Sequence, residues 1–504
     1  MEWRPCPLAH STAGLLEAAM PAVLQGLVPP PHSFLAAALA GNETVRVDVT
    51  PSREAPLKLR RNATLVKPAH RLLPLQHALA LLRSRRRAYE AYVRHLELRT
   101  PRTAALRAEL PLRAVFDLAG AQVEAANLWL GDGGVSSPLH YDGLDNLLVQ
   151  LAGEKRVRLL PPEAFPQLGY RPYHEHQFVF DEKLQAFAGH EPSGHGAMVE
   201  NHADVDVLSD VRGEAAGGEC VRAEAAVSAQ GLECVLREGQ TLFLPALWSH
   251  AVLSSPHPAS SSPAAGLNVA VNVWFIRGTH SFSRALAAQP AWSEAHFCHA
   301  EALHKTGRLA EAAAAYERSL ALRPAYFDAQ HNLASLRLAA ADAAAAADAF
   351  GRACALRPAD SRCLVNWGIA LARGGRLGEA AAAHAAAIAL APDEPRAWKA
   401  LGNARAREGR LGEAADALRA ALRLAPADAS VYNSLGVALD EAGRGAEAVA
   451  ALRAAVELDP ASDKARANLE MAVARGVEGE GASKLASSKL AHHVGPPAAN
   501  GKVE

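Results

Sequence analysis

Short apolar runs separated by Gly, Pro and Asp dominate the chain between residues 125 and 280. They read AANLWLG, DNLLVQLAGEKRVRLL, LECVLREGQTLFLP, LWSHAVLS and LNVAVNVWF, and they are rich in β-branched and aromatic residues. Such runs predict strands, and AGEK predicts a tight turn between two of them. A series of short strands is typical of a β-sandwich or jelly-roll barrel, whose interior is lined by alternate residues of each strand. We expect one domain over residues 1–280, with its core at about 120–277.

The first 95 residues mix strand and helix patterns. PAVLQGLV (21–28) and TVRVDVTP (44–51) predict short strands. LPLQHALALLRSRRR predicts an amphipathic helix, and YEAYVRHLELRT predicts a strand that carries Tyr92 inward. The basic run Arg83–Arg87 is expected to be a solvated helix face rather than a nucleic-acid contact, because no aromatic platform accompanies it.

Two segments interrupt the strand series. Residues 189–218 are rich in Gly, Ala, Asp and His, and residues 254–266 read SSPHPASSSPAAG. Both compositions predict mobile insertions, and long loops inside a domain usually either act at a site or have no structural role. His202 and Asp204 lie in the first insertion without a strand pattern, so we interpret this pair as loop.

A strict helical repeat occupies the C-terminal part of the chain. Pro290, Pro324, Pro358, Pro392, Pro426 and Pro460 are each 34 residues apart, which is the tetratricopeptide period. Gly307, Gly375, Gly409 and Gly443, with Ala341 in the equivalent place, are expected to turn between paired helices. The period predicts an all-α solenoid of five repeats, at 293–326, 327–360, 361–394, 395–428 and 429–462, then a capping helix at 463–475 and a disordered tail at 476–504.

Solenoids of this type present a groove, normally for a peptide or helix of another protein. A clamp for carboxylate groups is a weaker alternative for this groove. Asn332, Asn366 and Asn403 lie on the first helices of their repeats, but Lys and Arg residues at matching positions are not evident. We expect these amides to serve helix packing.

Charge and cysteine content narrow the class of protein. The 504 residues carry 52 Lys and Arg against 53 Asp and Glu, so no overall field attracts nucleic acid or an anionic membrane. The sequence contains no run of about 18 apolar residues, which is the length needed to span a bilayer as a helix. The six cysteines are scattered without a CxxC pair, which favours free thiols in a reducing compartment. The N-terminal residues lack the pattern of a secretory signal, so we expect a cytoplasmic or nuclear protein.

The candidate chemistry begins at His140 and Asp142, which are two residues apart on a predicted strand and therefore leave the same face. His250, in the broken strand TLFLPALWSHAVL, can join them. Two imidazoles and one carboxylate leave metal positions open and suit non-haem Fe(II) and oxygen chemistry, whereas structural zinc would need a fourth ligand. In isolation, His250 would be interpreted as a core histidine beside Trp248, and its combination with His140 and Asp142 favours a metal ligand instead.

Lys155 opens the strand after the AGE turn, between apolar residues, where an ammonium is costly without a partner. A dicarboxylate that chelates the metal at one end could reach Lys155 with the other. Asn146 and Asn272 are amides among apolar residues, and Asn272 shares a strand face with Trp274. Both amides could donate to such a ligand, and a satisfied buried network explains them equally well.

The segment from about Val45 to Phe275 resembles the small jumonji-C (cupin-type) oxygenases. The family pattern of an HxD, a following Asn, a Lys opening the next strand, a distal His and an NxW strand is matched by His140 and Asp142, Asn146, Lys155, His250, and Asn272 with Trp274. The resemblance implies a double-stranded β-helix with flanking helices, in which the triad binds Fe(II) and Lys155 pairs with the C5 carboxylate of 2-oxoglutarate. O2 would be the second co-substrate. The resemblance also implies hydroxyl contacts from Ser137 and Tyr92 to that carboxylate, with Trp274 and Trp248 lining the site.

Within this family the chain is most similar to the hydroxylases of lysyl side chains in GTPases linked to translation. Ser137 stands where Thr is more usual, and the two insertions alter the substrate rim. We expect a protein hydroxylase whose helical array docks the substrate or a partner protein. Histone or protein lysine demethylation and tRNA oxidation are alternatives, although no reader domain or basic face supports them. A second alternative is a scaffold protein with an inactive cupin module.

Overall fold

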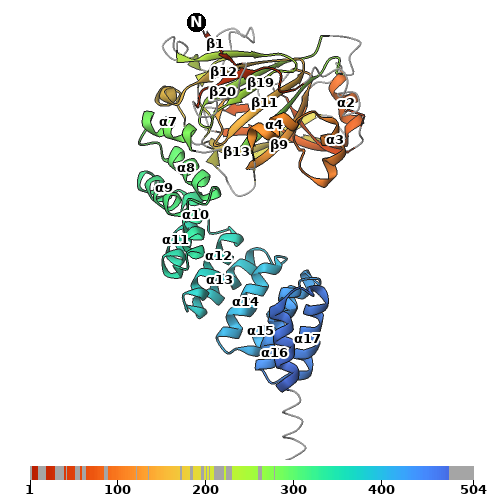
Figure 1. Cartoon of the computed structure of the whole chain (residues 1–504), viewed down its shortest axis with the longest axis vertical. Helices are drawn as coiled ribbons and strands as arrows, with labels where there is room; N and C mark the ends of the chain where they lie inside the picture. Colours follow the sequence, from red (N-terminus) through yellow and green to blue (C-terminus); the bar gives the residue numbers. More distant parts are fainter. Residues whose placement is uncertain are drawn as a thin grey trace, which may run out of the picture. The chain divides into compact units, whose positions relative to one another are not determined.

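The computed structural model describes residues 3–9, 19–28, 39–40, 43–51, 57–59, 64–84, 89–120, 122–133, 136–170, 173–181, 186–193, 198–199, 201–203, 205–208, 221–222, 230–258, 264–276 and 279–475. The chain forms two compact units, Met1–Leu322 and Arg323–Glu504 (Figure 1). The first unit extends past the expected boundary near residue 280 and includes the helix pair predicted as the first repeat.

The larger sheet of the first unit has nine strands. In hydrogen-bonded order they are β2 (Leu8–Ala9), β3 (Ala22–Leu24), β19 (Thr241–Leu244), β11 (Asp145–Ala152), β21 (Asn268–Phe275), β9 (Val123–Gly131), β8 (Glu90–Glu97), β4 (Thr44–Thr50) and β7 (Ala69–Pro74). Helices α2 (Leu75–Arg83), α3 (Ala104–Glu109) and α4 (Arg113–Ala119) share a hydrophobic cluster with one face of this sheet (Figure 1). Because its other face is also covered, β11 is buried along its whole length.

The smaller sheet has five strands, in the order β1 (Arg4–Pro5), β18 (Leu232–Leu236), β12 (Glu154–Leu160), β20 (Ser249–Ser255) and β10 (Ser136–Tyr141). Apolar residues of both sheets, among them Leu148, Val157 and Leu242, form one buried cluster between them. This pair of packed sheets is the predicted double-stranded β-helix, and the strand predictions are confirmed.

Gly153 carries the chain from one sheet to the other, so the AGEK turn joins strands that are not paired with each other. Its φ is +78°, and a Cβ there would lie 2.5 Å from the carbonyl oxygen of Ser255. Both conditions require glycine at this crossing.

A third sheet has the order β14 (Ala186–Pro192), β13 (Tyr173–Asp181), β6 (Thr64–Lys67) and β5 (Leu57–Leu59), and β15 (Met198–Val199) also pairs with β13. Two short strands, β16 (Val205–Asp206) and β17 (Val221–Arg222), pair with each other. The expectation that residues 189–218 form a mobile insertion is therefore wrong in part, because several of these strands lie within it. The insertion expected at 254–266 likewise begins inside β20, and residues 209–220 and 259–263 lie outside the described residues.

Four of the six cysteines form disulfides, which corrects the expectation of free thiols. Cys6 bonds to Cys234 because β1 runs parallel to β18 and brings their Cα atoms to 4.8 Å. Cys354 bonds to Cys363, which lies nine residues further on. Cys298 is free and buried, and Cys220 lies outside the described residues.

The helical repeats confirm the predicted solenoid. The first unit ends with α7 (His280–Ala288), α8 (Ser293–Lys305) and α9 (Leu309–Leu322). The second unit pairs α10 (Phe327–Ala339) with α11 (Ala343–Leu356), α12 (Ser361–Arg373) with α13 (Leu377–Leu390), α14 (Pro395–Arg407) with α15 (Leu411–Leu424), and α16 (Ala429–Glu441) with α17 (Gly445–Leu458), and a helix at 463–475 follows. The turn inside each pair uses a residue of positive φ, such as Gly375 at +81° or Ala341 at +63°. The expected tail at 476–504 lies outside the described residues.

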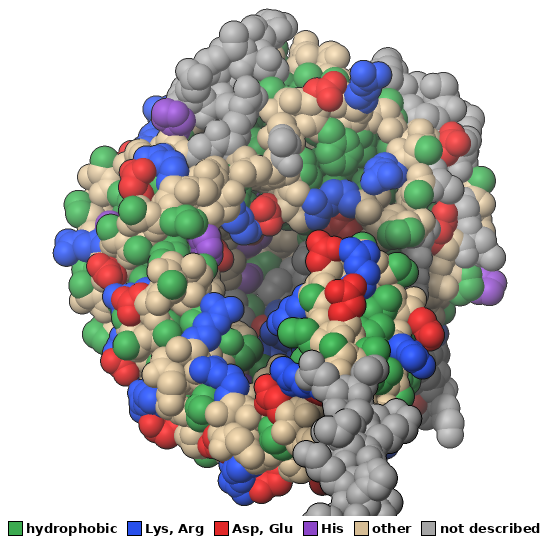
Figure 2. Space-filling model, turned by 60° about the horizontal axis from the view of Figure 1, so that its bottom comes forward, with side chains coloured by type: hydrophobic (Ala, Val, Ile, Leu, Met, Phe, Trp, Pro, Cys, Tyr) green, Lys and Arg blue, Asp and Glu red, His purple; other side chains and the backbone are tan. Residues whose placement is uncertain are grey.

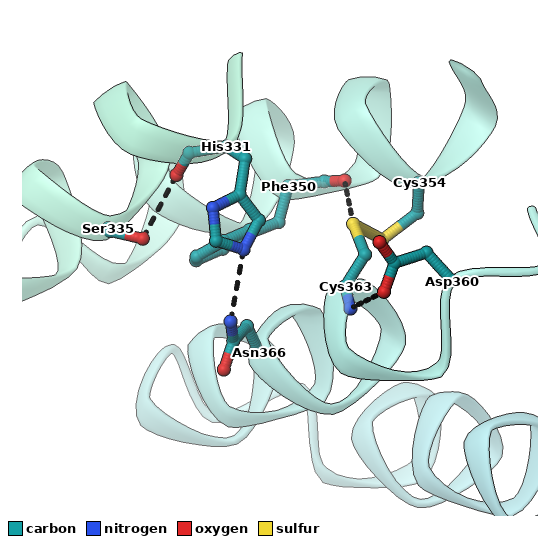
Figure 3. Close-up of a disulfide and its surroundings, with 7 residues drawn as sticks. All are labelled: His331, Ser335, Phe350, Cys354, Asp360, Cys363 and Asn366. Atoms are coloured by element: carbon teal, nitrogen blue, oxygen red, sulfur yellow. Dashed lines mark hydrogen bonds between the residues drawn. A yellow bond between two sulfur atoms is a disulfide. The ribbon is translucent and has the colours of Figure 1, made fainter. Parts of the chain in front are cut away.

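The Cys354–Cys363 disulfide joins α11 to α12 and so links the second repeat covalently to the third (Figure 3). Next to it, the Asn366 amide donates a hydrogen bond of 3.1 Å to Nε2 of His331, which lies on the first helix of the preceding repeat. This is a contact between repeats, as expected for an amide with a packing role.

Surface charges are mixed in sign. On the face drawn in Figure 2, Lys and Arg side chains are interspersed with Asp and Glu. Arg83 is exposed, as expected for the basic run, while residues 85–87 lie outside the described residues. Among the helices that the structure describes, none has the length and apolarity needed to cross a bilayer.

Candidate metal centre

The smaller sheet brings the three predicted metal ligands together. His140 on β10 lies directly opposite His250 on β20, and Asp142 follows β10 by one residue. Opposed residues on adjacent strands project from the same face, and the ligand atoms of all three side chains lie within 4.8 Å of one another. His250, which is far away in the sequence, thus completes a site with the local His140–Asp142 pair.

Backbone carbonyls orient both imidazoles. Nδ1 of His140 lies 2.8 Å from the carbonyl oxygen of Pro138, and Nδ1 of His250 lies 3.1 Å from that of Trp248. A carbonyl can only accept, so each Nδ1 carries the proton and each Nε2 offers its lone pair to a metal. Burial, followed by the neighbouring His140 ring, lowers the pKa of His250 to about 4, so His250 is neutral near pH 7.

Asp142 is held from two sides. Nε1 of Trp274, on the larger sheet, donates to its Oδ2 at 3.1 Å, and the backbone N–H of Leu247 donates to its carbonyl oxygen at 2.8 Å. Leu247 is fully buried with a φ of +64°, which is rare for a branched residue. This strained turn between β19 and β20 ties Asp142 to the strand that carries His250.

A cavity of about 550 Å³ opens onto the triad. Every other predicted site residue except one lines it, namely Tyr92, Ser137, Asn146, Lys155, Asn272 and Trp274. The exception is Trp248, which packs in the apolar cluster between the sheets and has the Arg284 guanidinium 5.1 Å from its ring centre. The expectation that Trp248 lines the site is therefore wrong, because its ring turns into the core while its carbonyl serves His250.

Lys155 lies in this cavity with 8% of its surface exposed, and its Nζ donates to Oγ of Ser254 at 2.7 Å. Burial lowers the pKa of its ammonium to about 8. Among the described residues, the Ser254 hydroxyl is the hydrogen-bond partner of the Lys155 ammonium, and no carboxylate forms an ion pair with this ammonium. A buried cation with a neutral partner suits an incoming anion.

The predicted amides face each other across neighbouring strands. Asn272 on β21 donates through Nδ2 to Oδ1 of Asn146 on β11 at 3.1 Å. This bond uses one polar group of each amide, so Nδ2 of Asn146 and Oδ1 of Asn272 are the groups that can serve a ligand in the cavity.

Three residues of the site, Asn201, His202 and Ser254, were not predicted from the sequence. His202, interpreted above as loop, lies against His140 as an isolated bridge on the open edge of β10, and both His202 and Asn201 line the cavity. The backbone of this segment pairs with β10 on both sides of His202, through Tyr141 N to Asn201 O at 3.1 Å and Ala203 N to Leu139 O at 2.9 Å. Asp204 lies outside the described residues.

Ser254, assigned above to a mobile insertion, is the hydroxyl partner of Lys155, because the two residues are opposite each other on β20 and β12. The sequence could have placed Ser254 on this strand, because the predicted strand run LWSHAVLS already ends at Ser254.

The donors fit Fe(II) and 2-oxoglutarate. Two imidazole nitrogens and one carboxylate, without a thiolate, match the facial set of non-haem Fe(II) oxygenases. Lys155 supplies a buried cation in the same cavity for the second carboxylate of a chelating keto acid.

Comparison with known proteins agrees with this geometry. The cupin-like domain family matches residues 29–280, and the C-terminal domain of cilia and flagella-associated protein 70, a tetratricopeptide domain, matches residues 265–500. The human bifunctional peptidase and (3S)-lysyl hydroxylase JMJD7 is 28% identical over 247 residues, which are 47% of this chain and 69% of that protein.

Other relatives are matched over smaller parts of their length. The lysine-specific demethylase JMJ32 of Arabidopsis thaliana is 27% identical over 34% of this chain and 48% of its own. The tRNA wybutosine-synthesizing protein 4 of Neurospora crassa is 29% identical over 28% of this chain and 9% of its own.

Among solved structures, YrrB, a TPR protein with an unusual peptide-binding site, is 20% identical with a TM-score of 0.34, over 37% of this chain and 97% of its own. MamA is 20% identical with a TM-score of 0.32, over 33% of this chain and 92% of its own. From the family match, the sheets and the 34-residue period, the chain belongs to the cupin-like family and joins a jumonji-C-type domain to a C-terminal tetratricopeptide array.

Proposed function

We propose that this protein is an Fe(II)- and 2-oxoglutarate-dependent oxygenase that hydroxylates a side chain of a protein substrate. The observation that carries the proposal is the presence of the triad and buried Lys155 in one cavity of about 550 Å³. Burying the Lys155 ammonium costs free energy, and a barrel without activity would gain nothing from placing it beside three converging metal ligands. A lysyl side chain is the first substrate to test, because one relative is named a lysyl hydroxylase.

Fe(II) and 2-oxoglutarate, when bound, supply the oxidation, in which one oxygen atom of O2 enters a C–H bond of the substrate and the other enters succinate as CO2 is released. The protein contributes geometry and exclusion of water. His140, Asp142 and His250 would hold the metal on one face, and Lys155 would pair with the distal carboxylate. Trp274 fixes Asp142 through its indole N–H.

The helical array is the proposed docking element. Arrays of this type bind peptides or helices of other proteins, and tethering a substrate to the same chain raises its concentration near the metal.

The test compares the full chain with His140→Ala. Under anaerobic conditions, Fe(II) and 2-oxoglutarate should give a weak visible charge-transfer band with the native chain and none with the variant. Peptide libraries and candidate proteins are then incubated with Fe(II), 2-oxoglutarate and air, and analysed by mass spectrometry. We expect a gain of about 16 Da that requires all components and is lost with His140→Ala.

The same experiment separates the alternatives. A loss of about 14 Da with formaldehyde release would identify a demethylase, since hydroxylation of an N-methyl group gives an unstable product. Modification of tRNA alone would identify a nucleic-acid oxygenase. Absence of the band together with partner binding by the repeats would leave the scaffold function.

A further inference from the structure

The first helical repeat contacts the turn that carries Asp142. A Cβ added to Gly143, the residue after Asp142, would lie 2.8 Å from Sγ of Cys298 on α8. Cys298 is buried, and burial raises the pKa of its thiol, so it acts here as an uncharged packing group. A residue larger than glycine at position 143 would therefore displace either α8 or the turn.

A second contact reaches the residue between the two local ligands. Trp292, at the start of α8, is 6% exposed. Its ring meets that of Tyr141 at right angles, with centroids 5.3 Å apart, and lies 3.9 Å from that of Phe165. Tyr141 separates His140 from Asp142 in the chain, so Trp292 packs behind both ligands.

The same aromatic cluster extends to the third ligand. Phe165, in the 3-10 helix at Pro162–Gln167, stacks on Tyr170 with centroids 4.7 Å apart. The Tyr170 hydroxyl donates to Oγ of Ser249 at 2.8 Å, and Ser249 immediately precedes His250. Tyr141, the chain neighbour of His140 and Asp142, thus belongs to the aromatic cluster around Trp292. Ser249, the chain neighbour of His250, is hydrogen-bonded to Tyr170 of the same cluster.

Polar contacts fix the helices against the same turn. Ser281 on α7 donates to Oδ1 of Asp145 at 2.7 Å, and the same oxygen accepts from the backbone of Ala246 at 2.8 Å. At the far end of α8, Lys305 forms a 2.7 Å ion pair with Glu124. Both ends of the α7–α8 segment are therefore attached to the sheets of the first unit.

The N-cap position of the first helix is aromatic in the first two repeats, with Trp292 and Tyr326, and acidic in the last three. Asp360 and Asp428 occupy the equivalent N-cap positions and accept hydrogen bonds from the first turn of their helices, whereas Trp292 forms no side-chain cap. An N-cap carboxylate stabilises a helix because it accepts hydrogen bonds from backbone N–H groups of the first turn that otherwise lack a partner. In α8 this stabilisation is exchanged for aromatic contacts behind the metal ligands.

From these contacts we infer that the first helical repeat is a structural part of the metal centre, and that Trp292 and Cys298 are positioning residues for Asp142 and the two histidines. The inference rests on the proposed metal site. It predicts that metal affinity depends on side chains of a repeat that the sequence groups with the protein-binding array.

The first test measures Mn(II) binding to the full chain by electron paramagnetic resonance, with near-UV circular dichroism as a check of folding. Trp292→Ala should weaken Mn(II) binding by about tenfold, the usual effect of losing support behind a ligand. Trp292→Phe, which keeps an aromatic face, should stay within about threefold of the native chain. Trp398→Ala, the same deletion in a repeat of the second unit, should leave Mn(II) affinity unchanged.

The second test is a double-mutant cycle and does not need Trp292→Ala to fold. Gly143→Ala should weaken Mn(II) binding because the new methyl meets Sγ of Cys298. Cys298→Ala should restore most of it in the double variant, since the nearest remaining atom of residue 298, its Cβ, would lie 3.8 Å from the new methyl.

Native Mn(II) affinity in folded Trp292→Ala, or additive losses in the cycle, would overturn the inference and leave the proposed function intact. If instead the native chain binds no Mn(II), or binds it as well after His140→Ala, the proposed function fails and the inference falls with it.

Discussion

The imidazole rings of His140 and His202 lie nearly parallel, at 15°, with centroids 5.3 Å apart. His202 is only 8% exposed, and its Nδ1 is 3.0 Å from Oδ1 of the preceding Asn201. A ring that is stacked on a metal ligand and held by its own backbone pairing restricts the tilt of that ligand.

We therefore predict that His202→Ala weakens Mn(II) binding severalfold and that His202→Phe, which retains a flat ring, restores it to within about twofold. Titration followed by electron paramagnetic resonance measures both. Equal losses in the two variants would show that the hydrogen bonds of His202 matter and that its ring does not.

The ammonium of Lys155 should limit 2-oxoglutarate binding at high pH. Burial lowers its pKa to about 8, so the free protein carries the cation below that pH and loses it above. Affinity should fall by up to about tenfold per pH unit above pH 8, because a neutral amine attracts the carboxylate weakly. Calorimetric titration with 2-oxoglutarate in the presence of Mn(II), from about pH 7 to about pH 9.5, measures this slope.

Lys155→Met should bind 2-oxoglutarate weakly at every pH and lose the slope. Lys399→Met removes a lysine that is paired with Asp428 in the second unit and should keep the native profile. A profile of Lys155→Met that still falls above pH 8 would assign the slope to another group.

A buried histidine weakens the array. His384 on α13 is 1% exposed, its Nδ1 has no hydrogen-bond partner among the described residues, and its ring packs on Gly368. In the next two repeats the same place is taken by Leu418 on Gly402 and Leu452 on Gly436. His384→Leu should raise the free energy of unfolding of this repeat by about 1 to 3 kcal/mol at pH 7, because an unpaired polar atom leaves the core.

The gain should increase in acid. Burial lowers the pKa of His384 to about 4 from 6.5, so the unfolded chain takes up a proton before the folded chain does. Stability contributed by the neutral ring is thus lost as the pH falls from 6.5 towards 4, by about 3 kcal/mol in total. Hydrogen–deuterium exchange of α12 and α13 measures this, and Leu418→His should reproduce the acid sensitivity one repeat later.

The Cys354–Cys363 disulfide should stabilise one junction of the array (Figure 3). Joining residues nine apart restricts the unfolded chain by roughly 2 to 3 kcal/mol. Replacing both cysteines with Ala, or reducing the native chain, should speed hydrogen exchange in α11 and α12 and leave α16 and α17 unchanged. Reductant should have no further effect on these helices in the double-alanine variant. Unchanged exchange at the junction would contradict the prediction.

The sequence predicted those elements and site residues that a local pattern of residues along the chain determines. Alternating valines located β4, the 34-residue proline period located every helix pair, and the spacing of His140 and Asp142 placed two ligands on one face. His250 could be added because TLFLPALWSHAVL has the pattern of a strand in the same barrel, and the resemblance to the jumonji-C family supported this choice.

The features that it did not predict depend on contacts between distant segments. His202 has no strand pattern of its own, and it reaches the site because β10 lies at the edge of its sheet and pairs there with the backbone of residues 201–203. Cys6 and Cys234 are 228 residues apart, and their pairing follows from strand order alone. The first repeat shares its period with the others, so only its contacts assign it to the first unit.

Gly153 sends the chain across the gap between the sheets, so that the ligands and Lys155 stand on one wall of the cavity and Asn146, Asn272 and Trp274 on the other. The distance between the two sheets, and with it the width of the cavity, is therefore set by the size of the apolar side chains packed between them. Replacing Leu159 or Leu242, which pack between the sheets and do not line the cavity, with residues of another size is expected to shift one sheet relative to the other. Homologues that accept bulkier or slimmer substrates could therefore differ in residues that never touch them.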